Sequence, residues 1–131
     1  MPNPSDRKYT KEHEWIKLEA DGTTATCGIT DHAQHLLTDI VFTELPSVGK
    51  PLEAGKPCCV VESVKSVSDV YAPVGGAVTE ANKALESAPQ NINNDPYNTG
   101  WIWKMRISNP AELNVLMTAD QYEAYIQNSA H

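Results

Sequence analysis

Lys65 is the residue of this sequence whose setting best suits covalent chemistry. It lies between two strand-like stretches, residues 58–62 and 67–71, in a tip that contains neither glycine nor proline. Such a tip favours a type I turn, which accepts most residues and presents one ammonium group to solvent on a rigid base. A modifying enzyme needs that presentation, because the lysine must enter a second active site while its own backbone stays fixed. From the turn alone, the commoner explanation is that Lys65 is an ordinary solvent-exposed turn lysine without a chemical role.

Cysteine and histidine residues give little sign of a second chemical centre. Cys27, Cys58 and Cys59 lack the spacing of a metal site and cannot all pair, which is typical of buried thiols in a reducing compartment. His32 and His35 lie three residues apart without an obvious third ligand, so the sequence predicts no metal site. A nucleophile elbow and a phosphate-binding loop are also missing from the sequence. The sequence therefore favours a protein that is not an enzyme.

The composition describes an acidic globular chain. Its 131 residues include 17 acidic and 10 basic side chains, and the formal net charge of −7 disfavours nucleic acid and anionic lipid as partners. The length fits a single domain over residues 1–131, with residues 1–8 as an N-terminal arm. No apolar run is long enough for a membrane span, and no Arg-rich transit sequence is present. We therefore expect a cytoplasmic protein, or one of the mitochondrial matrix if the chain is a trimmed eukaryotic one.

Two elements before Lys65 can be predicted from local signals. Residues 14–18 and 23–29 are rich in β-branched and apolar residues and flank Asp21-Gly22, which predicts a hairpin. Thr30 is placed to cap a short helix over residues 31–37.

The remaining central elements are mostly strands. A helical turn is expected over residues 82–87, and a loop over residues 88–100, which are rich in asparagine, proline and aspartate. Strands are expected over residues 39–45, 58–62, 67–71, 77–80 and 101–107.

The C-terminal residues 109–131 change from strand to helix periodicity. Asn109 is placed as a cap, with Glu112 three residues later to complete a capping box. Thr118 and Gln121 repeat the same signal before a second helix. The sequence therefore predicts a mainly β fold with short added helices, two of them at the C-terminus.

Five sequence blocks, in order and at compatible spacing, resemble the glycine cleavage H proteins. Together they are far more specific than any one of them, and the similarity runs from about residue 9 to residue 125. The blocks are Tyr9-Thr10-Lys11-Glu12-His13-Glu14-Trp15, Gly28-Ile29-Thr30-Asp31-His32-Ala33-Gln34, Asp39-Ile40-Val41-Phe42, residues 62–73 from Glu62 to Pro73, and Asn93-Asn94-Asp95-Pro96-Tyr97.

The resemblance implies a lipoyl-type barrel-sandwich fold of two small antiparallel sheets. It also implies that Lys65 is the lipoyl lysine, with lipoate as the covalently bound cofactor. Glu62 and Gly76 match an acidic residue and a glycine that the family presents to the lipoate-attaching enzyme. A solvated strand carboxylate and a turn glycine with positive φ are the alternative explanations for these two residues.

In this family the protein is a carrier and not a catalyst. Glycine decarboxylase, a pyridoxal phosphate enzyme, places the aminomethyl group of glycine on the arm, an aminomethyltransferase removes it, and dihydrolipoyl dehydrogenase reoxidises the dithiol. The resemblance further places Glu14 and Asp69 near the stored amine, in a cleft for the arm, where carboxylates can pair with its positive charge. For each, an exposed strand residue without such a role is the alternative.

Other swinging-arm carriers are the nearest alternatives. Biotinyl domains usually flank the lysine with methionines, whereas Val64 and Ser66 flank Lys65 here. Lipoyl domains of 2-oxoacid dehydrogenases are normally followed by flexible linkers, whereas this chain ends in two predicted helices. The sequence also leaves open the alternative that this is an H-like protein used for lipoyl relay.

Overall fold

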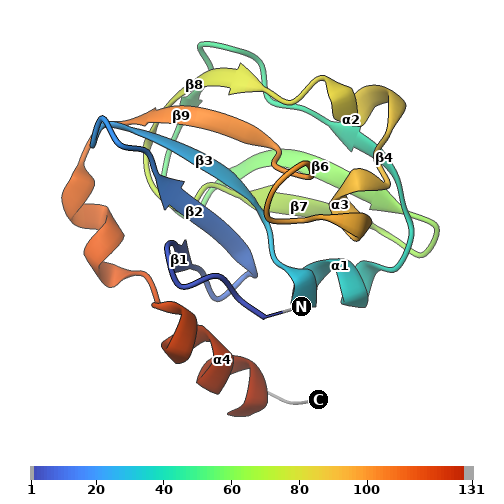
Figure 1. The fold of residues 1–131 in the computed structure, drawn as a ribbon. Helices are drawn as coiled ribbons and strands as arrows, with labels where there is room; N and C mark the ends of the chain where they lie inside the picture. Colours follow the sequence, from blue (N-terminus) through green and yellow to red (C-terminus); the bar gives the residue numbers. More distant parts are fainter. Residues whose placement is uncertain (1, 129–131) are drawn as a thin grey trace.

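Two antiparallel sheets form the framework of the computed structural model, which describes residues 2–128 (Figure 1). One sheet has six strands in the order β1-β2-β3-β9-β8-β5, and the other has three in the order β4-β6-β7. Their bounds are β1 Lys8–Tyr9, β2 Glu14–Leu18, β3 Thr24–Ile29, β4 Ile40–Glu44, β5 Pro51–Leu52, β6 Pro57–Ser63, β7 Val67–Tyr71, β8 Gly76–Ala81 and β9 Trp103–Ile107. The predicted mainly β fold with two antiparallel sheets is confirmed.

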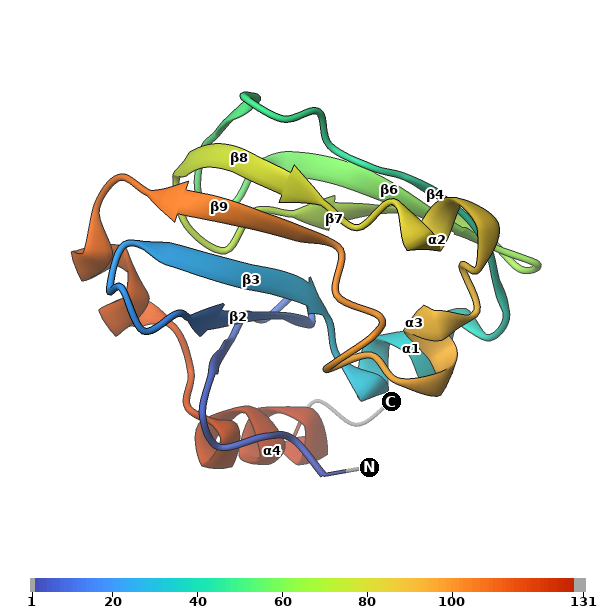
Figure 2. The ribbon, with the colours of Figure 1, turned by 45° about the horizontal axis from the view of Figure 1, so that its top comes forward.

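The core lies between the two sheets (Figure 2). Val61 and Val70 of the smaller sheet belong to one buried cluster with Cys27, Trp103 and Met105 of the larger one. These side chains come from alternate positions of their strands, so each sheet has one face in the core. A chain of this size therefore closes its core without disulfides, and all three cysteines are free.

Short helices complete the fold, and two of the predicted capping signals are confirmed. Thr30 accepts a hydrogen bond from the amide of Ala33 at the start of the first helix. Thr118 and Gln121 form a reciprocal capping box, with bonds of 2.9 and 3.2 Å. The helices are α1 Asp31–Leu37, α2 Ala84–Ser87, α3 Asn91–Asn94, the 3₁₀ helix η1 Pro110–Val115 and α4 Ala119–Asn128.

The C-terminal segment differs from the prediction in one cap. Asn109 caps η1 as expected, but the Glu112 carboxylate does not close a capping box and instead accepts a hydrogen bond of 2.8 Å from the amide of Gly75. Tertiary contact with the turn before β8 therefore overrides the local signal. The predicted helical segment ends at residue 131, and residues 129–131 lie outside the described part of the chain.

Three further elements were not predicted. The strands β1 and β5 have two residues each and gain their pairing from neighbouring strands, and α3 lies inside the predicted loop 88–100. In β4 the register shifts between Ile40 and Phe42, so strict alternation fails and Phe42 points outward with 52% of its surface exposed. Of the helices described, none is long and apolar enough to cross a membrane.

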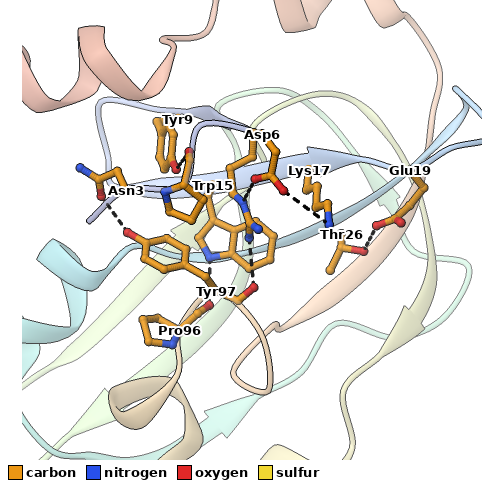
Figure 3. A network of polar contacts seen from close by, with 11 residues as sticks. Asn3, Asp6, Tyr9, Trp15, Lys17, Glu19, Thr26, Pro96 and Tyr97 are labelled. Carbon is orange, nitrogen blue, oxygen red and sulfur yellow. Dashed lines mark hydrogen bonds and ion pairs between the residues drawn. The ribbon is translucent and has the colours of Figure 1, made fainter. Parts of the chain in front are cut away.

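The N-terminal segment is anchored against β2 by a polar network (Figure 3). Arg7 is buried, lies 4.6 Å from the ring centroid of Trp15, and donates a hydrogen bond to the carbonyl of Tyr97. Trp15 in turn donates to the carbonyl of Pro96 at 3.1 Å. The Arg7 guanidinium also holds the pKa of Asp6 below its usual value, mainly through a side-chain hydrogen bond. Trp15 directly follows Glu14, so this network fixes the start of β2.

Candidate functional site

Lys65 lies in the turn that joins β6 to β7, at one end of the smaller sheet (Figure 1). Its side chain is exposed and takes part in no ion pair within the described residues. The ammonium nitrogen lies 3.4 Å from the backbone carbonyl oxygen of Leu36, at the C-terminal end of α1. The amine is therefore outside the core and reachable by a second protein.

Ser63 holds the backbone of this turn. Its buried hydroxyl accepts hydrogen bonds from the amides of Lys65 and Ser66, at 3.1 and 3.0 Å, and lies 3.2 Å from the carbonyl of Ser66, to which it can donate. The amide of Val64 donates to the carbonyl of Asp39, which ties the turn to the chain just before β4. The tip is thus rigid without glycine or proline. Sequence reasoning did not single out Ser63, although a serine two residues before the tip is a known turn signal.

Ser63→Ala is expected to loosen the turn and to slow acylation of Lys65. The substitution leaves two amides without their side-chain acceptor, which should cost about 1–2 kcal/mol of stability. Amide hydrogen exchange of residues 64–66 should rise. For the lipoylation of Lys65 that the resemblance implies, the initial enzymatic rate should fall. Ser66→Ala is the matched control, because the structure shows only backbone hydrogen bonds for Ser66. Equal lipoylation rates in the two variants would contradict the role given to Ser63.

Glu62 lies on the outer face of β6, between two exposed apolar residues of neighbouring strands. It is opposite Phe42 in β4 and Val67 in β7, which are 52% and 66% exposed. Val64, in the turn itself, is 68% exposed. An apolar surface with one carboxylate therefore adjoins Lys65. The outward position of Phe42 follows from the irregularity in β4 and had no sequence signal.

Gly76 is the first residue of β8, and β8 begins at the end of the molecule opposite the β6–β7 turn (Figure 2). The structure does not bring it together with Lys65. A Cβ atom at this position would lie 1.9 Å from the carbonyl oxygen of Arg106 in the adjacent strand β9, so the close strand approach requires glycine here. This structural reason stands beside the predicted role in recognition, which remains a prediction.

A cavity of about 230 Å³ opens between α1, β2 and β7, with Leu36 among its lining residues. Since the Leu36 carbonyl is also the contact of the Lys65 ammonium, the cavity begins within reach of that lysine. Glu14 and Asp69 both line it, so the structure brings together the two carboxylates that the resemblance had placed near a stored amine. The apolar part of the wall is formed by Ile29, Ala33, Leu37, Val61 and Val70.

The two carboxylates of the cavity differ in environment. Asp69 is exposed on β7, whereas only 2% of Glu14 is exposed. The Thr10 hydroxyl donates to one oxygen of Glu14 at 2.6 Å, and the amide of Tyr71 donates to the other at 3.2 Å. Burial raises the pKa of Glu14 to about 7, against the opposite effect of these two hydrogen bonds, and the charge of Glu12 adds to the rise.

The raised pKa of Glu14 predicts that the protein loses stability as the pH rises through the slightly acidic range. Below the ordinary pKa of 4.5, both the folded and unfolded chain keep this proton. Between 4.5 and about 7 the unfolded chain releases it while the folded chain retains it, so the free energy of unfolding falls with rising pH. The total change from this group is at most about 3 kcal/mol.

Urea unfolding of Glu14→Gln across that pH range is the measurement. The variant is expected to lose most of this decline in the free energy of unfolding, because glutamine resembles the protonated carboxyl, with one acceptor oxygen and one donor group, and does not titrate. Glu53→Gln, at an exposed position, serves as the control and should keep the decline. An unchanged pH profile in Glu14→Gln would contradict the assignment.

Among residues 2–128, no group of three or more His, Cys, Asp or Glu side chains lies close enough together to hold a metal ion. His35 faces the carboxylate of Asp31 at 3.3 Å. Burial raises the pKa of the Cys27 thiol, so this sulfur is a packed core atom and not a nucleophile.

Comparisons with known proteins point to one family. The sequence matches the family model described as "Glycine cleavage H-protein" over residues 7–129. It is 51% identical over 125 residues to the glycine cleavage system H protein of Enterobacter sp. strain 638, covering 95% of this chain and 96% of that one. The H protein of Thiobacillus denitrificans is 50% identical over 131 residues, covering 100% of both.

A solved structure has the same fold. The crystal structure of a glycine cleavage system H protein from Mycobacterium marinum superposes with a TM-score of 0.86 at 39% sequence identity. The match covers 98% of this chain and 100% of that one.

Proposed function

We propose that Lys65 carries a covalently bound lipoyl group, because this chain belongs to the glycine cleavage H-protein family. The chain is accordingly the lipoyl carrier of the glycine cleavage system and not an enzyme. Family membership does not by itself assign the attachment residue. We assign it to Lys65 and treat residues 1–131 as one carrier domain.

One observation carries the assignment. The Lys65 ammonium stands on a turn fixed by Ser63 and lies 3.4 Å from the carbonyl of Leu36, a residue that lines a cavity with two carboxylates. An arm attached there can swing outward to a partner or fold back past Leu36. The cavity has an apolar wall for an alkyl chain and Glu14 and Asp69 for a cationic end group.

The residues present fit a lipoyl group. Amide formation removes the charge of Lys65 and takes the formal net charge from −7 to −8. The bound group supplies a disulfide that accepts the aminomethyl group of glycine and can be regenerated by thiol–disulfide exchange. The chain itself contributes the rigid turn, the apolar wall and the carboxylates. A cargo held against this wall would be less accessible to water, which would slow its hydrolysis.

Recognition by the lipoate-attaching enzyme is proposed for the outer face of the turn. Glu62 projects there between Phe42 and Val67, which gives that enzyme one charge and two apolar contacts beside Lys65. The other partners proposed are glycine decarboxylase, aminomethyltransferase and dihydrolipoyl dehydrogenase. Since the relatives named above are bacterial proteins, we place the carrier in the cytoplasm.

Intact-mass analysis tests the proposal. Protein made in cells supplied with lipoate should gain the mass of a single lipoyl group, and peptide mapping should place it on the peptide that contains Lys65. A modification on another lysine would overturn the attachment site. A biotin increment in its place would favour the biotinyl carrier. A glycine decarboxylation assay with the partner proteins separates the glycine cleavage carrier from a lipoyl relay protein.

A further inference from the structure

His13 is a half-buried residue of the cavity wall whose role the carrier function does not explain. Its φ of +73° lies in the left-handed region, which is uncommon for a residue with a side chain. Two backbone hydrogen bonds hold it there: its amide donates to the carbonyl of Thr10, and its carbonyl accepts from the amide of Thr30. Strained residues held in this way often mark functional positions.

A chain of hydrogen bonds joins the His13 ring to the C-terminal helix. The Nδ1 atom of His13 lies 2.7 Å from the hydroxyl of Tyr122 in α4, and that hydroxyl lies 2.8 Å from the hydroxyl of Thr30. Tyr122 and Thr30 are both fully buried, so solvent supplies no alternative partner. Burial also raises the pKa of Tyr122, which keeps its proton in place near neutral pH.

Which atom donates in each of these two hydrogen bonds follows from counting donors and acceptors. The Thr30 hydroxyl already accepts from the amide of Ala33, and within residues 2–128 its own proton has Tyr122 as its only partner. If Thr30 donates to Tyr122, then the single proton of the Tyr122 hydroxyl is free to donate to Nδ1 of His13. The reverse direction would leave the Thr30 proton buried without an acceptor, which is unfavourable.

We propose that Tyr122 and Thr30 fix His13 as the neutral Nε2–H tautomer, so that the cavity receives from His13 a hydrogen-bond donor and no proton acceptor. Nε2 has no hydrogen-bond partner in the described part of the chain, and His13 is only half-buried. The wall then presents Glu14 and Asp69 as its acceptors for a cationic cargo, whose positive charge favours the ionised form of Glu14. His13 is therefore a positioning residue, and the C-terminal helix acts through it.

The charge state of His13 agrees with this role. Burial lowers its pKa to about 4, and the nearby ring of His32, 4.7 Å away, adds to the effect. The imidazole therefore stays uncharged at neutral pH and does not repel an ammonium group. A positively charged histidine at this position would compete with a cationic cargo for the two carboxylates.

Nitrogen-15 NMR of the His13 ring tests the tautomer directly. In the unmodified protein near neutral pH, Nε2 should carry the proton and Nδ1 should show the shift of an unprotonated nitrogen. Tyr122→Phe removes the hydroxyl but keeps the ring that stacks on Tyr9, and should give a mixture of tautomers. A wild-type ring protonated at Nδ1 would overturn the proposal, and that measurement requires no variant to fold.

A second measurement addresses the cargo and rests on the proposed function. In lipoylated protein loaded with the aminomethyl group and separated from its partners, Tyr122→Phe should release formaldehyde several-fold faster than the wild type. Tyr125→Phe is the matched control: it also lies in α4 with its ring near His13, but within residues 2–128 its hydroxyl is hydrogen-bonded only to the carbonyl of Lys11. Equal release from both variants would overturn the positioning role. Failure to lipoylate Lys65 would refute the proposed function and leave the NMR result standing.

Discussion

Replacing Lys65 with arginine is expected to leave the fold intact and to abolish both lipoylation and coupling to glycine decarboxylation. The side chain is exposed and has a single weak contact, to the carbonyl of Leu36 at 3.4 Å, so its loss should change the free energy of unfolding by no more than about 0.5 kcal/mol. Arginine keeps the positive charge but does not form the amide. Mass spectrometry after lipoylation and a glycine decarboxylation assay with the partner proteins measure the two effects.

Lys56→Arg is the matched control for this experiment. Lys56 is also an exposed lysine in a turn, and it directly precedes β6, so the exchange tests whether any lysine near this sheet suffices. The control should be lipoylated and coupled as the wild type is. Residual coupling in Lys65→Arg would refute Lys65 as the attachment residue, and a loss in both variants would point to a general defect.

Gly76→Ala is expected to have the largest effect on stability among the substitutions considered. The added Cβ would lie 1.9 Å from the carbonyl oxygen of Arg106 and 3.0 Å from the Met105 side chain, so β8 and β9 must separate locally. Overpacking of this kind costs about 1–3 kcal/mol, and contact with backbone rather than a flexible side chain favours the upper end. Urea unfolding measures the loss.

The same variant separates the two explanations for Gly76. If the glycine is required only for the close approach of β9, the fraction of Gly76→Ala that remains folded should be lipoylated at the normal rate. A lower rate for folded protein would support recognition by the attaching enzyme. Gly75→Ala is the control, because a Cβ at that buried neighbour would meet its nearest atom at 3.3 Å and needs only a small adjustment. A stability loss in Gly75→Ala as large as in Gly76→Ala would contradict the steric argument.

Local signals predicted those elements whose capping and turn residues act within a few positions. The Asp21-Gly22 hairpin and the Thr118–Gln121 capping box appear as expected, because each depends on hydrogen bonds between near neighbours. Glu112 does not complete the capping box, because its carboxylate accepts a hydrogen bond from the amide of Gly75, which is distant in sequence. A short-range sequence pattern does not show that a distant backbone amide competes with the local cap for the same carboxylate.

In the candidate site, too, features that depend on nearby residues were predicted, and features that depend on contacts distant in sequence were not. The exposed position of Lys65 followed from the composition of its turn, but the burial of Glu14 depends on contacts with Thr10 and with Tyr71, which lies 57 residues away. Family resemblance named Glu14 and Asp69, and only the fold showed that both line one cavity. The links from His13 to Tyr122 join residues 109 positions apart, and no local pattern indicated them.

The hydrogen bond between α4 and the cavity wall has a consequence for the order in which the protein matures on the ribosome. Translation delivers β6, the Lys65 turn and β7 well before it delivers Tyr122, the residue that closes the contact with His13 and Thr30. The β6–β7 hairpin and the contact that supports the cavity wall at His13 are therefore completed at different times. A nascent or truncated chain that stops before α4 would expose Lys65 while the cavity wall at His13 still lacks its contact with Tyr122.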